Sequence, residues 1–371
     1  QEVAGNRLLS LSVIDGYPGG GLGLDKTITR AEVAVVLAKI SGMGSAADLL
    51  KDTPSKFSDV KPNEWYTGWV NLASAQGWVK GDPQGTFRPN DPVQYREMVT
   101  MLLKALGYND NLPGDWPTNY LAKAASLGIT KGIVTDAKAH AVRGDVFIMT
   151  SRTLDKDTVS YDKDNDKFVA SGKSLLEDKM EFAKVSGFVT DIPRVSSLKS
   201  NQIRIDGKVY KVVGEVDYEE IFGVEVNAWL NDDDEVVFVD ITSDAVYYDA
   251  LSDVTEDELT LSDADADYDF AKNVKVFING ESAKASDLAA SYDYAKVVLD
   301  EDGDVAFIDA YDFDFLVVEK VDSNDVLGYG DEIDAEDYTI VKDGKTIALA
   351  DLAKGDILFY NSSAEYAEVF N

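Results

Sequence analysis

The sequence predicts a multidomain protein in which an α-helical module of three repeats is followed by all-β modules. Within residues 1–154, a pattern of helix, glycine turn and helix occurs three times. Beyond Lys156, apolar and polar residues alternate between Asp-Gly and Asn-Gly turns, which is typical of β-hairpins. The 371 residues are enough for two or three domains at about 100–200 residues each.

Charge divides the chain at the same place. Residues 1–154 hold 16 Lys and Arg against 15 Asp and Glu, a net charge of +1. Residues 155–371 hold 19 against 53, a net charge of −34. Such an asymmetry indicates that the two parts have different roles. The acidic part would repel nucleic acids and anionic surfaces and attract cations, so we expect no nucleic-acid partner.

The composition excludes several chemistries. The chain has no cysteine, which rules out disulfides, thiol catalysis and cysteine-ligated metal. His140 is the single histidine, so the chain offers only one imidazole for a catalytic triad or a metal site. No apolar run approaches the roughly 18 residues that a transmembrane helix needs. No phosphate-binding glycine loop or nucleophile motif occurs, and we therefore expect no enzyme activity.

The clearest repeat runs from Phe57 to Tyr108. Apolar residues at helical spacing predict a first helix, the Gly81–Gly85 turn ends it, and a second amphipathic helix follows. A unit of roughly fifty residues is typical of repeat modules. The apolar faces hold Trp65, Trp69, Leu72 and Ala73 in the first helix and Met98, Leu102, Leu103 and Leu106 in the second. Together with Trp78 and Trp116, these tryptophans are interpreted mainly as core residues, with stacking on sugar rings as the alternative.

Two further copies flank this repeat, so that the three span residues 5–44, 55–110 and 111–154. The other predicted elements are helices over Arg7–Val13, from Thr29, around Tyr120 and from Val142, and turns over Gly16–Gly20 and Gly128–Gly132. A unit of this size cannot bury its apolar face alone. We therefore expect the three copies to stack around a shared core.

Three motifs in these repeats resemble the signature of the S-layer homology (SLH) domain. They are Phe57-Ser58-Asp59-Val60, Gly81-Asp82-Pro83-Gln84-Gly85-Thr86-Phe87 and Thr29-Arg30-Ala31-Glu32. The resemblance covers residues 5–154 and implies a helical module with pseudo-threefold symmetry. It also implies a secreted protein of the bacterial cell surface that binds a secondary cell-wall polysaccharide, often a pyruvylated one, without a covalent link.

The motif at residues 29–32 also has a direct physical interpretation. Thr29 and Glu32 form a capping box, with Thr29 at the N-cap and Glu32 three residues later. Arg30 is not needed for capping. It would project beside the free N–H groups of a helix N-terminus, where its guanidinium adds to a site for a carboxylated sugar. A structural salt bridge is the alternative role for Arg30.

The copies differ at the arginine position. In the second copy Tyr95 aligns with Arg30, and Arg96 is displaced by one residue, which rotates a side chain by about 100° around a helix. In the third copy Arg143 is in register, whereas Val142 cannot cap the helix. We therefore expect two grooves to bind polysaccharide better than the third. The candidate glycan-binding residues are Arg30, Arg143, Asp59, Trp65, Gly81 and Tyr95.

Asp59 has two possible roles among these candidates. Aspartate readily accepts hydrogen bonds from nearby backbone N–H groups, so we expect Asp59 to fix its own corner through a local turn bond. The resemblance to the SLH domain implies in addition that Asp59 borders the glycan groove.

The second part of the chain is predicted to contain a polar link and three β units. The link covers residues 155–167, and the units cover residues 168–250, 251–315 and 316–371. Each unit combines a hairpin at an Asp-Gly or Asn-Gly turn with a second hairpin around a polar loop, which favours small barrels or sandwiches. The third unit stops inside or just after a strand at Asn371, so we expect it to be incomplete.

Clustered carboxylates make calcium the candidate cofactor. The alternating aspartates of residues 162–166 lack the glycine and the bidentate glutamate of an EF-hand loop, so that type of site is rejected. Asp300, Asp302 and Asp304 also alternate and are the candidate calcium ligands, bound between modules or between chains. A solvated hairpin turn at Asp302-Gly303 is the alternative.

Together these features favour a structural cell-surface protein. Residues 5–154 would anchor it to wall polysaccharide, and residues 168–371 would assemble with other copies into an S-layer or a surface filament. Two alternatives remain: a wall-anchored binding module whose β units hold a soluble ligand, and an SLH-anchored carbohydrate-active enzyme.

Overall fold

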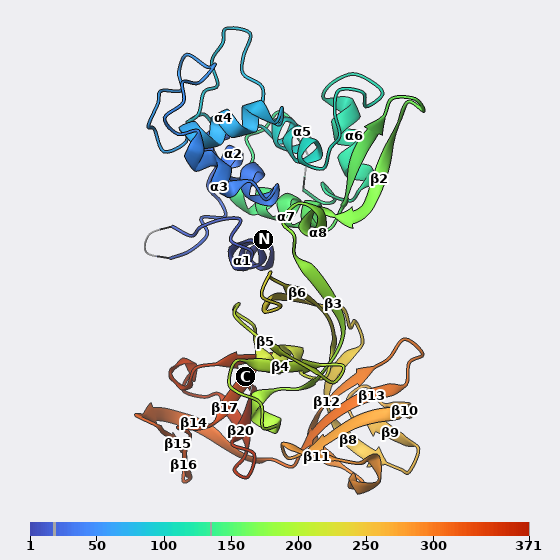
Figure 1. The fold of residues 1–371 in the computed structure, drawn as a ribbon. Helices are drawn as coiled ribbons and strands as arrows, with labels where there is room; N and C mark the ends of the chain where they lie inside the picture. The colour runs from blue at the N-terminus through green and yellow to red at the C-terminus, as the bar shows by residue number, and fades with distance from the viewer. Residues whose placement is uncertain (18–19, 134–135, 371) are drawn as a thin grey trace. The chain divides into compact units, whose positions relative to one another are not determined.

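The computed structural model describes residues 1–17, 20–133 and 136–370, which form two compact units (Figure 1). Unit 1 comprises Gln1–Ala183 and is mainly helical, and unit 2 comprises Lys184–Asn371 and consists mainly of β-strands. The predicted order of a helical part and a β-rich part is confirmed. Pro18 and Gly19 of the first predicted turn, and the predicted incomplete end at Asn371, lie outside the described residues. Within the described ranges, every helix is too short or too polar to cross a bilayer.

Unit 1 contains a pair of helices in each predicted repeat. The pairs are α1 (Glu2–Ser10) with α2 (Arg30–Ile40), α4 (Thr67–Ala75) with α5 (Tyr95–Ala105), and α6 (Thr118–Ser126) with α7 (Arg143–Leu154). The helices α3 (Gly44–Leu49) and α8 (Leu175–Asp178) are additional. The first helix ends before the predicted Val13 because Ser12 has a φ of 56° and turns the chain out of the helix.

The segments that precede α2, α5 and α7 meet in a ring of backbone hydrogen bonds. The Ile28 N–H donates to the Ala141 carbonyl at 3.2 Å, the Ala141 N–H donates to Val93 at 2.9 Å, and the Val93 N–H donates to Ile28 at 3.0 Å. All three residues are buried. The ring brings the N-termini of the three second helices together. Pseudo-threefold symmetry of the whole module stays a prediction.

The predicted link at residues 155–167 is part of the fold of unit 1. Its chain contributes to an antiparallel hairpin, and the Val159 N–H donates to the Leu106 carbonyl at 2.7 Å. The strands are β1 (Asp157–Asp162) and β2 (Lys167–Ser174). The prediction of a solvated link was wrong because two polar strands can satisfy each other's backbone groups. The boundary between the units follows Ala183 instead.

Unit 2 contains three β-sheets. The first consists of β3 (Ala183–Asp191), β4 (Gln202–Ile205), β5 (Lys208–Lys211), β6 (Glu225–Leu230) and β7 (Val236–Ile241). The second consists of β8 (Val246–Val254), β9 (Glu258–Leu261), β10 (Ala266–Ile278), β11 (Glu281–Ala283), β12 (Tyr292–Leu299) and β13 (Val305–Tyr311). The third consists of β14 (Asp314–Asp322), β15 (Asp325–Gly328), β16 (Glu332–Asp334), β17 (Thr339–Lys342), β18 (Lys345–Ile347), β19 (Ile357–Asn361) and β20 (Tyr366–Phe370). A short helix, α9 (Tyr218–Ile221), precedes β6.

The first sheet closes into a small barrel. Its strand order is β5-β4-β3-β6-β7, and a parallel bridge between Val212 and Val236 joins the chain after β5 to β7. The predicted hairpin of β4 and β5 is confirmed. Its turn residues Asp206 and Gly207 have φ angles of 43° and 83°, as a mirror-image turn that fits the twist of a hairpin requires.

The boundaries between the β units differ from those predicted. Strand β8 crosses the predicted boundary at residues 250 and 251, and it pairs with β9 and β12 of the second sheet. The first of the three β units therefore ends after β7, and the third β unit begins with β14. The boundary predicted at residues 250 and 251 rests on the spacing of turns. The sheet to which a strand belongs depends instead on the strands with which it forms hydrogen bonds.

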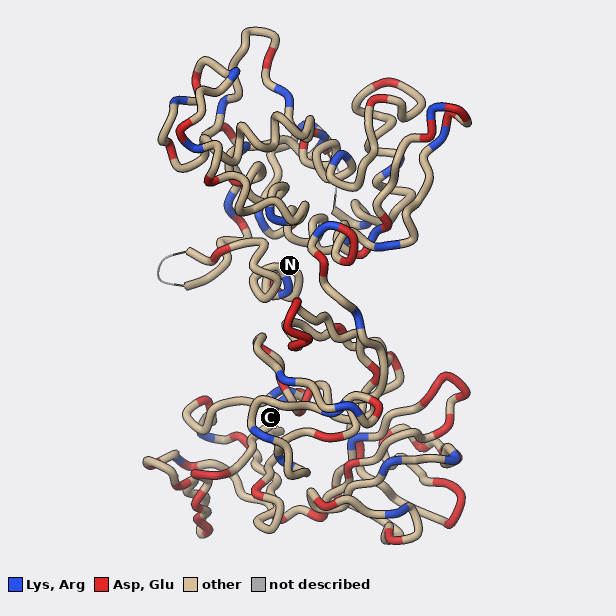
Figure 2. The backbone as a smooth tube through the Cα atoms, viewed as in Figure 1, with Lys and Arg blue, Asp and Glu red and all other residues tan. Residues whose placement is uncertain are grey.

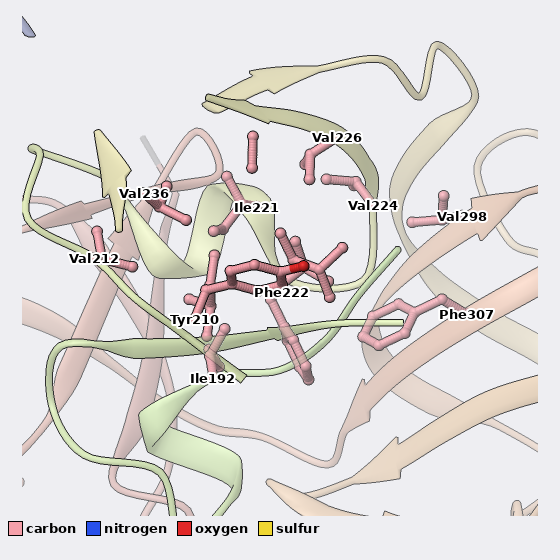
Figure 3. Packing of buried hydrophobic residues seen from close by; sticks show 14 of the residues in the cluster. Ile192, Tyr210, Val212, Ile221, Phe222, Val224, Val226, Val236, Val298 and Phe307 are labelled. Atoms are coloured by element: carbon pink, nitrogen blue, oxygen red, sulfur yellow. The ribbon is translucent and has the colours of Figure 1, made fainter. Parts of the chain in front are cut away.

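The three sheets share cores, so unit 2 is not a row of separate modules. Figure 3 shows Phe222 among the aliphatic side chains of the barrel, with Phe307 of the second sheet beside it, and their ring centroids are 4.8 Å apart. A second cluster joins the second and third sheets through stacked rings of Tyr311 and Tyr366, whose centroids are 4.6 Å apart. These contacts connect all three sheets.

The two units differ in how many acidic and basic residues they contain and in where these residues lie. Unit 1 holds 21 Lys and Arg against 23 Asp and Glu, whereas unit 2 holds 14 against 45. In Figure 2, red segments gather at the loops of unit 2, while red and blue segments are mixed over unit 1. The acidity of unit 2 therefore includes its loops and turns as well as its strands.

Candidate functional site

The candidate site of unit 1 is built around the acidic residue three positions into each second helix. Glu32 caps its own helix, since Oε2 accepts the Thr29 N–H at 2.7 Å and the Thr29 hydroxyl accepts the Glu32 N–H at 3.2 Å. The predicted capping box is confirmed. The other oxygen, Oε1, accepts a hydrogen bond from Arg143 Nη1 at 3.0 Å. One glutamate therefore caps its helix and joins the first repeat to the third.

The second position repeats this arrangement, whereas the third has the contact between repeats without the helix cap. Glu97 Oε2 accepts the Gln94 N–H at 3.0 Å, and Oε1 accepts a hydrogen bond from Arg30 Nη1 at 3.0 Å. At the third position the carboxylate of Asp145 accepts a hydrogen bond from the Tyr95 hydroxyl. Burial, and then this hydrogen bond, raise the pKa of Tyr95 to about 12. Tyr95 thus fills the arginine position, and its hydroxyl remains a donor.

Arg30 is buried and held by several partners. Besides its ion pair with Glu97, its Nε donates to the Phe87 carbonyl at 2.8 Å and its Nη2 donates to the Lys80 carbonyl at 3.1 Å. These contacts use three of the five guanidinium N–H groups. The structural salt bridge that the sequence left open is present. Arg30 does not project freely from the helix end, but it does line a groove.

Arg143 is held in a similar way. Its Nε donates to the Leu22 carbonyl at 3.0 Å, and its guanidinium carbon lies 4.8 Å from the ring centroid of Tyr17 and 5.1 Å from that of Phe147. Cation–π contacts of this kind add to the stability of a desolvated arginine. Both arginines are therefore fixed in position before any ligand binds.

The groove beside Arg30 has a volume of about 420 Å³. Its charged lining residues are Arg30, Lys80 and Lys104 and, with opposite charge, Asp82, Glu97 and Asp110. The groove is thus close to neutral. Trp116 forms part of the lining and is held by the Thr100 hydroxyl, which accepts the indole N–H at 3.0 Å. The guanidinium of Arg96 lies 5.1 Å from the same indole ring.

The groove beside Arg143 is larger, at about 1190 Å³. It is lined by residues of the first repeat together with Trp65, Asn90 and two residues of α7. Its charged lining residues are Lys26 and Arg143 and, with opposite charge, Asp15 and Glu32. Each groove therefore combines a fixed arginine, balanced charge and a tryptophan.

The prediction that the tryptophans are core residues was wrong for two of them. Trp78 is 8% exposed, as predicted, but Trp65 is 58% exposed and Trp116 is 50% exposed. Both exposed residues lie just before a helix begins, at Thr67 and Thr118, so helical periodicity does not describe where they point. Their exposure favours the alternative role of stacking on a ligand.

Asp59 and Gly81 fix the turn beside the first groove. Asp59 does not make the predicted local turn bond, because its two oxygens accept the N–H groups of Phe87 and Arg88 at 2.8 and 2.7 Å, 28 and 29 residues away. A Cβ on Gly81 would lie 2.6 Å from the Thr86 carbonyl oxygen, so only glycine fits there. Gly81 lines the groove, whereas Asp59 acts by holding the chain around it.

Sequence reasoning missed the cluster around Asp110. The hydrogen bond from Lys80, at 2.8 Å, is the main reason why the pKa of Asp110 is lowered to about 2. The Tyr120 hydroxyl donates to the other carboxylate oxygen at 3.0 Å, and Lys104 lies 3.5 Å from it. These residues are up to 40 positions apart and share no motif, so no local pattern could have joined them.

The candidate calcium ligands form a hairpin turn. Asp300 Oδ1 accepts the N–H groups of Asp302 and Asp304, both at 3.0 Å. Over the described ranges, no group of three or more acidic, histidine or cysteine side chains is arranged to hold a metal ion. A calcium ion shared between two chains would need ligands from the second chain, and that part of the prediction is untested.

Comparisons with known proteins identify the repeat. A match to the S-layer homology domain family covers residues 56–99, which lie within the second repeat. The middle cell wall protein of Brevibacillus brevis is 29% identical over 94% of this chain. The surface layer protein of Brevibacillus choshinensis is 26% identical over 95% of this chain. The chain spans 40% and 38% of the lengths of these two relatives.

The similarity to enzymes is confined to a shorter segment. An exoglucanase of Acetivibrio thermocellus is 29% identical over 36% of this chain and 14% of its own length. The two Brevibacillus relatives align, by contrast, over nearly the whole chain and are a wall protein and a surface-layer protein. The chain therefore contains an S-layer homology domain at residues 56–99, and over most of its length it is similar to wall and surface-layer proteins of bacteria.

Proposed function

We propose that unit 1 binds a secondary cell-wall polysaccharide and that unit 2 assembles with other copies into a surface layer or filament. One observation carries the first part of this proposal. Two grooves each combine an arginine fixed at a helix start with an exposed tryptophan. This combination suits a sugar that has one apolar face and one carboxylate.

The chemistry of such binding follows from the balanced charges of the grooves. A carboxylate on the sugar, such as a pyruvyl ketal, would accept hydrogen bonds from guanidinium N–H groups that Arg30 and Arg143 do not use internally. The tryptophan ring would stack on the sugar face. Because backbone carbonyls already fix both arginines, binding would lose little side-chain entropy.

The second part of the proposal rests on unit 2. The hydrophobic cores shared by its three sheets make unit 2 one compact domain, so every copy would offer the same surface for assembly. The relatives named above are a wall protein and a surface-layer protein. Unit 2 carries 45 acidic against 14 basic residues, so neighbouring copies repel each other at low ionic strength. We propose that divalent cations bridge this repulsion, with Asp300, Asp302 and Asp304 as candidate ligands.

A pull-down on purified cell walls tests the anchor. Replacing both Trp65 and Trp116 with alanine should weaken binding about tenfold or more, since stacking contributes roughly 1–1.5 kcal/mol per ring. Tyr329→Ala is the matched control, because Tyr329 is a 69% exposed ring outside both grooves. Wall binding by the double variant equal to that of the control variant would contradict the proposed site.

Negative-stain microscopy tests the assembly. Ordered sheets or fibres of the purified chain in the presence of calcium would support a structural role. Monodisperse particles that still bind the wall would favour the alternative of a wall-anchored binding module. Hydrolysis of wall glycan by the same preparation would favour an anchored enzyme.

A further inference from the structure

Unit 2 contains a pocket of about 390 Å³ between its second and third sheets. The walls include three aromatic rings, from Tyr248, Tyr294 and Phe370. The rings of Tyr248 and Tyr294 are roughly parallel with centroids 6.5 Å apart, and Phe370 meets Tyr294 edge to face at 6.2 Å. Aromatic faces of this kind attract cations, because the ring faces carry partial negative charge.

A buried carboxylate lines the same pocket. Glu368 is 4% exposed, and its Oε1 accepts hydrogen bonds from the hydroxyls of Tyr294, at 2.8 Å, and Tyr366. Within the part of the chain that the structure describes, its Oε2 accepts no hydrogen bond and joins no ion pair. Asp343 lies on the pocket wall as well. Neither lysine nor arginine is among the described residues that line it.

The charges behind the pocket do not balance. Arg194 is paired with Glu219 at 2.7 Å and with Asp309 at 3.1 Å. Lys296 donates to the backbone carbonyls of Glu219 and Glu220 at 2.9 and 3.2 Å. The buried cluster therefore has two cations, Arg194 and Lys296, and three carboxylates, Glu219, Asp309 and Glu368. Of the three carboxylates, Glu368 is the one that pairs with neither cation within ion-pair distance in the described chain, and it lines the pocket.

The titration of the neighbouring groups agrees with this geometry. Burial is the main reason why the pKa of Glu368 is raised to about 7, and the phenol hydrogen bonds offset it in part. Burial, followed by the charge of Glu368, raises the pKa of Tyr248 to about 12. Glu368 is thus charged above neutral pH. Among the described residues no cation lies within ion-pair distance of it, and Lys296 lies 5.7 Å from the ring centroid of Tyr248.

We propose that this pocket binds a primary alkylammonium group, with the ammonium beside Glu368 and the alkyl chain against the rings of Tyr248 and Phe370. Calcium fits less well, because it takes about six to eight oxygen ligands and the carboxylates among the described lining residues are only Glu368 and Asp343. A lysine side chain of a second copy and a free small amine share this chemistry. The inference stands whether or not unit 1 binds polysaccharide.

Titration of the full chain with n-butylammonium chloride at about pH 8 tests the proposal, with ligand-observed NMR as the readout. Equal concentrations of 1-butanol and of sodium chloride are the controls for the alkyl chain and for ionic strength. We expect saturable binding of butylammonium and weaker binding of butanol. Glu368→Gln keeps an acceptor for both phenols but removes the charge, and it should weaken binding about tenfold or more.

Three further variants make the test specific. Glu365→Gln is the matched control, because Glu365 is an exposed acid on the loop before β20. Tyr248 is 45% exposed, so changes there should leave the fold intact. Tyr248→Phe keeps the ring and should retain binding, whereas Tyr248→Ala should lose most of it. Equal binding by wild type, Glu368→Gln and Tyr248→Ala, or equal binding of butanol and butylammonium, would overturn the proposal.

Sedimentation measurements on the same proteins distinguish the two sources of the ammonium group. If a neighbouring copy supplies it, both butylammonium and Glu368→Gln should weaken self-association of the full chain. If a free amine is the natural ligand, Glu368→Gln should weaken butylammonium binding to the same extent, and neither the variant nor butylammonium should change self-association. Either result supports an ammonium site and identifies what fills it.

Discussion

The two units both bury charged side chains where their parts meet, but they balance these charges differently. In unit 1, the buried Arg30 and Arg143 are each paired with one carboxylate that keeps contact with water, since the side chains of Glu97 and Glu32 are 27% and 29% exposed. In unit 2, the side chain of Arg194 is 9% exposed and faces two carboxylates that are 8% and 5% exposed.

The difference in exposure gives the ion pairs of unit 1 and the buried charge cluster of unit 2 different roles. A partly hydrated ion pair at a groove can exchange one partner for a ligand at low cost, because water compensates the group that is released. A fully buried cluster cannot, because any unpaired charge stays desolvated. Unit 1 is therefore suited to exchange with an anionic ligand, and the cluster of unit 2 is suited to holding its sheets together.

The largest effect is expected from breaking the buried cluster. Arg194→Met leaves Glu219 and Asp309 without their cation and should lower the free energy of unfolding of unit 2 by about 3–5 kcal/mol. Urea unfolding followed by circular dichroism measures it. Arg204→Met is the control, because Arg204 is 34% exposed and its pair with Asp191 should contribute about 1 kcal/mol or less. Equal losses in the two variants would contradict the comparison.

A change of pH should have a smaller effect on the free energy of unfolding, and its sign should be opposite in the two units. The pKa of Glu368 is raised from its ordinary 4.5 to about 7, so the stability it contributes is present below about pH 4.5 and is lost as pH rises through 7. Unit 2 should lose about 2–3 kcal/mol over this range. The lowered pKa of Asp110 acts the other way, because its contribution is present above pH 3.8 and is lost as pH falls through about 2.

Unfolding curves at several pH values check this prediction. Glu368→Gln should remove most of the dependence of unit 2 between about pH 5 and 7. The groups that face Glu368 and could also titrate are Lys296, Asp309, Glu219 and the phenols of Tyr294 and Tyr366. The pKa of both phenols is raised well above 10, so a profile that is the same in the variant would show that Lys296 or another carboxylate, rather than Glu368, sets the slope.

A comparable substitution in unit 1 should lower the free energy of unfolding less than Arg194→Met does, but it should reduce wall binding more. Arg30→Met removes an ion pair with a partly exposed glutamate and should lower the free energy of unfolding of unit 1 by about 1.5–3 kcal/mol. It should also reduce pull-down on cell walls. Lys179→Met serves as control, because the Lys179 side chain is 45% exposed and pairs with Asp178, outside both grooves. Normal wall binding by folded Arg30→Met would remove Arg30 from the binding site.

Calcium should have the smallest effect on a single chain and act mainly between chains. Millimolar calcium should increase light scattering more than sodium chloride of matched ionic strength, because sodium only screens the repulsion over a Debye length of about 8–10 Å. A chelator should reverse the increase. Replacing Asp300, Asp302 and Asp304 together with asparagine tests the candidate ligands. Equal scattering under all these conditions would leave direct contact between strand edges as the better explanation.

Local patterns in the sequence predicted much of the secondary structure. The three pairs of helices followed from apolar residues at a period of 3.6, and Thr29 with Glu32 specified a helix start that the structure contains. The Asp206-Gly207 hairpin followed from turn chemistry alone. These predictions succeeded because each depends on residues a few positions apart.

Predictions that depended on distant partners failed more often. Trp65 and Trp116 were assigned to the core, but they lie before their helices and are exposed. Residues 155–167 looked like a solvated link because they are polar, yet their backbone forms a hairpin on unit 1. Strand β8 was divided between two units because turn spacing does not reveal which strands pair.

The sequence by itself determined the order of the two parts, their difference in charge, the helix starts and the hairpin turns. Each of these follows from composition or from contacts within one turn of chain. Only the tertiary structure decided that Arg30 pairs with Glu97, that Glu32 also holds Arg143, and that Glu368 faces a pocket whose described lining includes neither lysine nor arginine. The partners in each case are tens of residues apart, and burial, which sets the energy of a charge, depends on every element that packs around it.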